Sequence, residues 1–304
     1  MKKKILALLL GLSLALALTA CGSGTNAGSG EDASAAPEDA QTEESQAEES
    51  AEAGEDAAEA QSEAGAGSEE AAGELTTVSP GKLTMSTNAA FPPYEMTTDD
   101  GGYEGIDVEI AGMIAEKLGL ELQIDDMDFD AALLAAQNGK SDIVMAGVSV
   151  TESRLAVMDF SDSYATGIQV VIVKDGSDVT MDNLGDHMIG TQRGTTGYIY
   201  ASDSPENGGY GEDHVTVYDN GMSAVQALMN GQVDCVIIDN APAHAFVSAN
   251  PGLSILEGDW VREDYAIGMA KGNTALQSAI NGALAELTAD GTIQAVLDKY
   301  ISAE

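Results

Sequence analysis

Two short polar segments carry side chains of opposite charge directly after strand-like runs. Ser149 and Arg154 come shortly after the run 142–145, and Asp239 follows the run 233–238. In open α/β sheets, ligands bind beyond the carboxyl ends of the strands, so both segments are expected at a binding site. A guanidinium and a carboxylate at one site would suit a zwitterion such as a free amino acid.

The elements that must position these residues alternate between strand and helix. The apolar pattern predicts a strand over 83–87, a helix over 106–118, a strand over 120–124, a helix over 130–137 and a strand over 142–145. Asp107 is predicted to cap the first helix and Gly119 to end it. Repeated alternation of this kind predicts an α/β fold with a mostly parallel sheet.

A faint internal repeat suggests that this plan is used twice. A helix that ends in Asn-Gly leads to an aspartate and an apolar strand over 133–145, and the same order recurs 92 residues later over 225–237. One interpretation is that the chain forms two lobes built on one plan. The other is that any α/β sheet can reuse such a unit. The charged residues that follow the two copies favour two lobes.

Several short motifs occur along 82–304 in an order typical of one protein family. They cover residues 88–95, 105–109, 128–130, 146–154, 159–161, 192–196 and 233–239. On these motifs the chain resembles the polar amino-acid-binding proteins that serve ABC importers, the extracellular solute-binding protein family 3. The resemblance implies an α/β fold with two lobes, like that of periplasmic binding proteins, with the ligand in the cleft between them.

The same resemblance implies where the lobes begin and end. Two strands would cross between the lobes near 167–169 and 264–266. Lobe 1 would comprise 81–167 and 266–304, and lobe 2 would comprise 168–265. The two lobes would close on the ligand like a hinged clamp.

The resemblance also implies roles for the polar residues. Arg154 would pair with the α-carboxylate of the ligand through both arms of its planar guanidinium. Asp239 would take the α-ammonium group, and its position also suits the N-cap of the next helix. The Ser149 hydroxyl and the Gly147 carbonyl would add contacts to the carboxylate and the amine. Thr196 would bring a backbone N–H to the carboxylate at a helix start.

Two aromatic residues complete the implied site. Phe91 and Phe129 would sandwich the side chain of the ligand. The full predicted ligand-binding set is Asn88, Phe91, Phe129, Ala146, Gly147, Ser149, Arg154, Gln192, Thr195, Thr196 and Asp239.

Asn88 and Gln192 bear on the choice of ligand. Both are neutral, and an amide offers both a donor and an acceptor. A lysine or arginine head buried between them without a counter-charge would cost several kcal/mol, so an uncharged polar ligand is expected, glutamine first. The negative charge of the domain favours a cation at long range, so arginine or lysine is the alternative.

The N-terminus is typical of a secreted, lipid-anchored protein. Three lysines precede an uncharged run over 5–20, which is shorter than the ~20 residues that span a bilayer. Residues 18–21 (Leu-Thr-Ala-Cys) resemble a bacterial lipoprotein processing site. That resemblance implies removal of a signal peptide over 1–20 and a lipid on Cys21. The alternative is an ordinary secretion signal with a coincidental cysteine.

Residues 21–80 are predicted to be a disordered acidic tether behind that cysteine. Residues 22–80 hold 16 acids and no Lys or Arg, and they have few large apolar side chains to bury. The formal charge of the whole chain is −39, and residues 81–304, with 35 acids and 9 bases, still carry −26. This charge excludes nucleic acid as a partner. Cys235 is predicted to be a buried small hydrophobe without a disulfide.

Together these features predict a monomer on the extracellular face of a Gram-positive cell membrane, or in the periplasm of a Gram-negative cell. It would bind a free amino acid and pass it to an ABC transporter permease. No cofactor or metal is expected, because the three histidines are scattered. A secreted cyclic amino-acid dehydratase is a remote alternative, but it needs a titrating group where Asn88 and Gln192 stand. An amino-acid sensor would need a transmembrane segment and a signalling domain.

Overall fold

The computed structural model describes residues 75–301, so the predicted signal peptide, Cys21 and most of the tether lie outside the described residues. The strands are β1 (Lys82–Thr87), β2 (Ala90–Phe91), β3 (Glu95–Thr97), β4 (Tyr103–Glu104), β5 (Glu121–Asp126), β6 (Ile143–Val144), β7 (Met158–Lys174), β8 (Ile189–Gln192), β9 (Val215–Tyr218), β10 (Cys235–Asp239), β11 (Leu253–Ile255) and β12 (Val261–Ala270). The helices are α1 (Ile106–Lys117), α2 (Phe129–Gln137), α3 (Glu152–Leu155), α4 (Thr196–Ser202), α5 (Gly221–Met229), α6 (Asn240–Ala249), α7 (Thr274–Ala289) and α8 (Thr292–Tyr300). This alternating order confirms the predicted α/β class.

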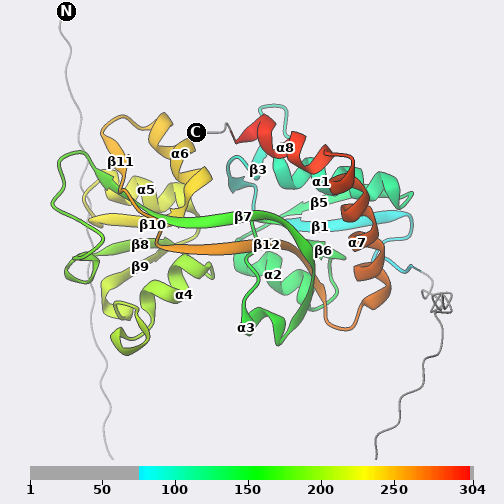
Figure 1. Cartoon of the computed structure of the whole chain (residues 1–304), viewed down its shortest axis with the longest axis horizontal. Helices are drawn as coiled ribbons and strands as arrows, with labels where there is room; N and C mark the ends of the chain where they lie inside the picture. Colours follow the sequence, from blue (N-terminus) through cyan, green and yellow to red (C-terminus); the bar gives the residue numbers. More distant parts are fainter. Residues whose placement is uncertain (1–74, 302–304) are drawn as a thin grey trace, which may run out of the picture. The chain divides into compact units, whose positions relative to one another are not determined.

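One large sheet runs through this part of the chain (Figure 1). Its strands lie in the order β5-β1-β6-β12-β7-β10-β8-β9, and β11 pairs with β7. β1 is parallel to both β5 and β6, and β8 is parallel to both β10 and β9. β7 and β12 are antiparallel to each other. Parallel strands therefore lie on both sides of one long antiparallel pair, which is also antiparallel to β6 and β10, so the prediction of a mostly parallel sheet is wrong.

The pair β7 and β12 divides the sheet into two halves. The β1 half contains β1, β5 and β6 with helices α1, α2, α7 and α8, and the β8 half contains β8, β9 and β10 with helices α4, α5 and α6. Figure 1 shows β7 and β12 running from one half into the other, with α1, α5, α6 and α8 above the strands and α2 and α4 below them. The crossovers predicted at 167–169 and 264–266 fall within these two strands. The predicted lobe boundaries stay predictions.

Part of the core lies between the apolar faces of β1 and α1. Leu83 and Met85 point to one face of β1 and share a cluster with Ile110 and Ile114 of α1, and all four are fully buried. Burial of each such side chain contributes about 1.5–3 kcal/mol. Cys235 of β10 is buried as a free thiol, as predicted.

The start of α1 differs from the prediction. Gly105 occupies the N-cap position, and Asp107 lies fully buried in the first turn. Its carboxylate accepts hydrogen bonds from the Gly147 backbone N–H at 3.0 Å and from the Tyr164 hydroxyl at 2.7 Å. The prediction that Asp107 caps the helix is wrong, because this carboxylate holds the loop that follows β6.

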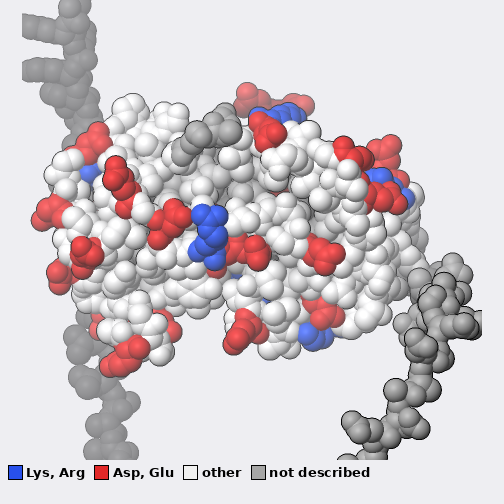
Figure 2. Space-filling model, viewed as in Figure 1, with Lys and Arg blue, Asp and Glu red and all other residues white. Residues whose placement is uncertain are grey.

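Acidic side chains are spread over the surface. Figure 2 shows Asp and Glu over much of the visible face, with Lys and Arg at few places. Some of these bases are paired, as in Lys117–Glu286 at 2.8 Å and Lys271–Asp159 at 3.0 Å. Exposed pairs of this kind contribute at most about 1 kcal/mol. Within residues 75–301, no helix combines the length and the apolar character needed to cross a bilayer.

Candidate ligand-binding site

A small cavity gathers residues from both halves of the molecule. It is lined by Phe91, Phe129, Ala146, Gly147, Ser149, Arg154, Thr195, Thr196 and Asp239. Every one of these residues belongs to the predicted ligand-binding set. About 10 Å³ of the cavity is open to the centre of a water molecule, which is room for about one water.

Arg154 is a buried cation at the wall of this cavity. It lies on α3, and only 7% of its surface is exposed. Its guanidinium donates to the backbone carbonyls of Ser149 at 2.7 Å and Gly194 at 3.1 Å, and it lies 5.5 Å from the centre of the Phe129 ring. Burial lowers the pKa of this guanidinium. The charges of Glu263 and Asp239 oppose this shift, and a bound carboxylate would add a directly bonded charged partner.

Asp239 is a buried carboxylate in the same wall. It ends β10 and takes the N-cap position of α6, but its side chain makes no capping hydrogen bond. Instead it accepts a hydrogen bond from the hydroxyl of Tyr265 on β12. Burial, and then the charge of Glu263, raise the pKa of Asp239 to about 7. Because Asp239 lines the cavity, a ligand cation bound there would favour its ionised form.

A glycine on β7 makes the contact between Tyr265 and Asp239 possible. A Cβ at Gly167 would lie 2.3 Å from the Tyr265 hydroxyl oxygen. Real side chains do not approach so closely, so the ring reaches Asp239 only because position 167 has no side chain. Tyr265 also packs edge-on against Tyr94, with 5.2 Å between the ring centres.

The start of α4 brings backbone and hydroxyl groups to the cavity. Thr195 is the N-cap residue, and its hydroxyl accepts from the Tyr198 backbone N–H at 3.3 Å. Thr196 is the first helical residue and is 2% exposed. Its backbone N–H has no acceptor within the helix, as at any helix start. This arrangement suits the predicted contact with a ligand carboxylate.

The two predicted aromatic walls come from the β1 half. Phe91 of β2 and Phe129 of α2 both line the cavity and are at most 8% exposed. Gly147 lies beside them with a φ of +55°, and a Cβ there would come 2.8 Å from the Phe91 ring. Glycine at this position therefore allows the positive φ and leaves room for the Phe91 ring.

Asn88 and Gln192 lie next to each other but do not line this cavity. The Gln192 amide in the β8 half donates to the Asn88 side-chain oxygen in the β1 half at 3.0 Å. Asn88 in turn donates to the Met127 backbone carbonyl at 2.9 Å. The two amides are thus brought together, as the prediction of a shared site requires, and they bond directly to each other in this structure.

The sequence does not predict two further buried acidic residues, of which Glu263 bonds directly to residues that line the cavity. Glu263 of β12 is 8% exposed and accepts hydrogen bonds from Ser149, Thr196 and Gln169. The alternation along β12 could have indicated Glu263, because it lies two residues before the buried Tyr265 and so on the same face.

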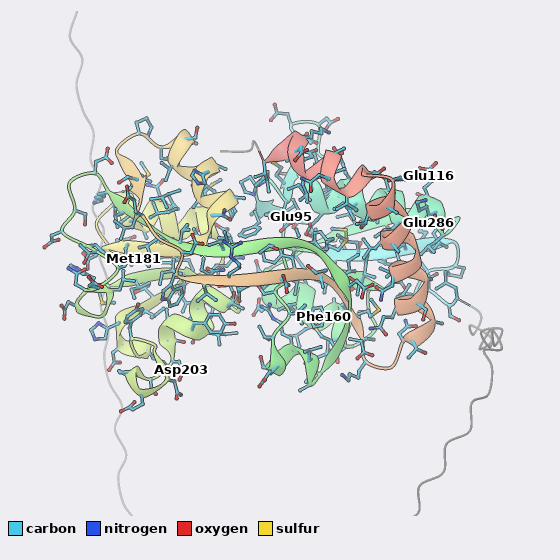
Figure 3. The ribbon with its side chains drawn as sticks, viewed as in Figure 1. Glu95, Glu116, Phe160, Met181, Asp203 and Glu286 are labelled. Carbon is cyan, nitrogen blue, oxygen red and sulfur yellow. The ribbon has the colours of Figure 1, made fainter. Side chains whose placement is uncertain are left out.

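Glu95 is the second unpredicted group. This residue, labelled in Figure 3, is fully buried on β3. Burial, and then the charge of Asp107, raise its pKa well above the usual range, while burial raises the pKa of Asp107 to about 6. Asp107 supports the cavity, because its carboxylate accepts a hydrogen bond from the backbone of Gly147.

Residues 83–303 match the model of the bacterial extracellular solute-binding proteins, family 3. The chain belongs to this family. It is 29% identical over 228 residues to the L-cystine-binding protein TcyJ of Escherichia coli, covering 74% of this chain and 84% of the relative. It is 30% identical over 237 residues to a probable histidine-binding protein of Neisseria gonorrhoeae, covering 74% and 85%.

Solved structures agree with this assignment to family 3. An ancestral arginine-binding protein bound to glutamine is 36% identical, and the match covers 73% of this chain and 99% of that protein with a TM-score of 0.68. The family resemblance and the two-lobe binding-protein fold predicted from the motifs are therefore confirmed. The chain is an extracellular solute-binding protein and not an enzyme, which sets the dehydratase alternative aside.

Proposed function

We propose that this solute-binding protein captures a free polar amino acid, with glutamine as the favoured ligand, and delivers it as a monomer to the permease of an ABC transporter. The observation that carries the proposal is the pair of buried opposite charges at one cavity. Arg154 is 7% exposed, Asp239 is also 7% exposed, and both line the same small space. An α-carboxylate and an α-ammonium group would neutralise this pair of side chains.

A panel of the twenty amino acids tests the proposal on the full-length chain. At 1 mM, a ligand with a dissociation constant near 1 μM stabilises the native state by about 4 kcal/mol, which raises the Tm by roughly 10 °C for a domain of this size. Differential scanning calorimetry measures the shift. Butyrate and butylamine each carry only one of the two charges and serve as controls that should leave the Tm unchanged. A panel in which no amino acid raises the Tm would overturn the proposal.

Glutamine is favoured because of the amides of Asn88 and Gln192. They are 9% and 5% exposed, and together they present a donor and an acceptor without a charge. A bound glutamine could exchange their mutual hydrogen bond for bonds to its own amide. A cationic ligand would find no carboxylate in this pair, and its desolvation would cost several kcal/mol. Arginine or lysine remains the alternative because residues 81–304 carry a net charge of −26.

Asn88→Asp should shift preference toward cationic amino acids. The introduced carboxylate would supply a counter-charge, and hydrogen bonds between charged groups contribute about 1.5–3 kcal/mol. The ratio of arginine affinity to glutamine affinity should therefore rise at least about tenfold. Competition calorimetry measures the ratio. Asn230→Asp adds the same charge at an exposed site and should leave it unchanged. If the wild type already binds arginine tenfold tighter than glutamine, the choice of glutamine is wrong.

We also propose that a lipid on Cys21 anchors the protein, with residues 22–80 as its tether. Cys21→Ala should release the protein from the membrane, because the run 5–20 is too short to act as a stable transmembrane anchor. Fractionation of cells at high salt measures the release, since salt screens any electrostatic binding. Cys235→Ala is the matched control and should stay in the membrane fraction. An alanine variant at position 21 that also stays there would contradict the lipid anchor.

A further inference from the structure

Glu263 brings three elements to one carboxylate oxygen. Its Oε2 atom accepts from Ser149 Oγ at 3.1 Å, from Gln169 Nε2 at 3.2 Å and from Thr196 Oγ1 at 2.7 Å. Ser149 lies in the loop after β6, Gln169 lies on β7, and Thr196 begins α4. The carboxylate therefore joins the two halves of the molecule through the strand β12.

The hydrogen bonds use up the protons of both hydroxyls. A serine or threonine hydroxyl has one proton to donate and two lone pairs that accept, whereas a carboxylate only accepts. Ser149 and Thr196 both line the ligand cavity. With each proton directed at Glu263, each hydroxyl oxygen can offer only lone pairs to a ligand, and one lone pair of Thr196 already accepts from Gln169 Nε2 at 3.5 Å. Lone pairs attract an ammonium group and repel a carboxylate.

Glu263 also acts as a charge on its buried neighbours: it opposes the lowering of the pKa of Arg154 by burial and, together with burial, helps to raise the pKa of Asp239. Glu263 is 8% exposed, and its Oε1 atom and the Oε1 atom of Gln169 have no hydrogen-bond partner within the described residues. A buried acceptor without a donor is destabilising, so this arrangement is not what stability alone would select. Asp264, the next residue after Glu263 on β12, is exposed.

We propose that Glu263 is a positioning residue: it takes the protons of Ser149 and Thr196 and so turns both hydroxyl oxygens, as acceptors, toward the ammonium group of the ligand. The ammonium group would then lie among Asp239 and the two hydroxyl oxygens. The α-carboxylate is left to Arg154 and to backbone N–H groups at the start of α4. This inference rests on the proposed function, because it requires an amino-acid ligand.

A ligand-free experiment tests the hydrogen bonds themselves. The Tm is measured for the full-length wild type, Glu263→Met, Thr196→Val and the double variant. In Thr196→Val, Ser149 and Gln169 still donate to Glu263. Each single change removes one side of the hydrogen bond between Thr196 and Glu263, and the double variant loses that bond only once. The loss in the double variant should therefore be smaller than the sum of the single losses. The same cycle with Asp264→Met in place of Glu263→Met is the control and should be additive. Additive losses in the first cycle would overturn the proposal.

A second experiment tests the orientation of the ligand. The probes are L-glutamine and its counterpart without the amino group, glutaramic acid, and calorimetry gives both affinities. Glu263→Met frees the hydroxyls to donate to a carboxylate, so the preference for glutamine over glutaramic acid should fall at least about tenfold. Glu263→Gln keeps an acceptor oxygen and should retain most of this preference. If Glu263→Met weakens both probes by the same factor, or Glu263→Gln loses as much preference as Glu263→Met, the positioning role is overturned.

Failure of the proposed function would be visible separately. If the wild type does not bind glutamine, L-arginine and 5-guanidinopentanoic acid replace the two probes. If the wild type binds neither amino acid, the ammonium role fails together with the proposed function. The ligand-free cycle then still decides whether Glu263 holds the Thr196 hydroxyl.

Discussion

Arg154→Lys should weaken amino-acid binding by at least about 100-fold. A lysine ammonium is a point charge and cannot reproduce the two parallel hydrogen bonds of a guanidinium to a carboxylate. Lysine also has fewer hydrogen-bond donors than arginine. The carbonyls of Ser149 and Gly194, which accept from Arg154 at 2.7 and 3.1 Å, would therefore be incompletely paired. Loss of one partner of a buried charge pair costs about 2–5 kcal/mol, and calorimetry measures the change in affinity.

Arg262→Lys is the matched control for this substitution. Arg262 lies on β12, its side chain is 62% exposed, and it pairs with Asp259 at 3.1 Å. An exposed pair contributes little, so affinity should stay at the wild-type value. Circular dichroism of both variants establishes that the fold is retained. Wild-type affinity in folded Arg154→Lys protein would remove Arg154 from the site.

Binding should weaken as the pH falls through 7. Burial raises the pKa of Asp239 to about 7 in the ligand-free protein, while a bound ammonium group favours the ionised carboxylate. Below the pKa the ligand must displace a proton, so affinity at pH 5.5 should be roughly 20-fold lower than at pH 7.5. Calorimetry in two buffers of different ionisation enthalpy should also detect release of about half a proton per ligand at pH 7.

The stability of the ligand-free protein should change in the opposite direction. The folded-state pKa of Asp239 lies above its unfolded value, so the native state binds the extra proton between about pH 4 and pH 7. The stabilisation is complete below the unfolded pKa and is lost as the pH rises through the folded pKa. The free energy of unfolding should therefore fall by up to about 4 kcal/mol across this window. Asp107, with its pKa raised to about 6, acts in the same direction.

The Asp239→Asn variant tests whether the Asp239 carboxylate, and not another acid, causes the pH dependence of binding. The variant should bind at least about tenfold more weakly at pH 7.5, because the ligand ammonium loses its counter-charge. It should also release no proton on binding near pH 7. Persistence of the wild-type pH profile for affinity in this variant would assign the titration to another group.

The sequence predicts those parts of the site that depend on local order. Arg154 and Asp239 each come shortly after a buried strand, and the carboxyl ends of such strands border the cleft in folds of this kind. The strands β1 and β10 and the helix α2 are recognisable because their apolar periodicity is read within a few residues. The predicted set that lines the cavity follows from these positions and from the family motifs.

Other parts of the site depend on contacts between distant residues. Glu263 meets Ser149 across 114 positions of the chain, and Gln192 meets Asn88 across 104. No local sequence pattern encodes these contacts, because they depend on how β12 pairs with β7 and on how the two halves meet. Asp107 shows the same limitation. An acid at a helix start suits an N-cap locally, but in the structure its carboxylate accepts a hydrogen bond from the backbone N–H of Gly147 in a distant loop.

The bond between Asn88 and Gln192 has a consequence for the speed of capture. Together with the contact from Arg154 to Gly194, it joins the two halves beside a cavity of which about 10 Å³ is open to the centre of a water molecule, so an amino acid cannot enter while both bonds are made. The ligand can therefore enter only after these two hydrogen bonds have broken. The measured dissociation constant then equals the intrinsic dissociation constant divided by the fraction of molecules in which both bonds are broken. The residues that decide how tightly the amino acid is held need not be the ones that decide how quickly it enters.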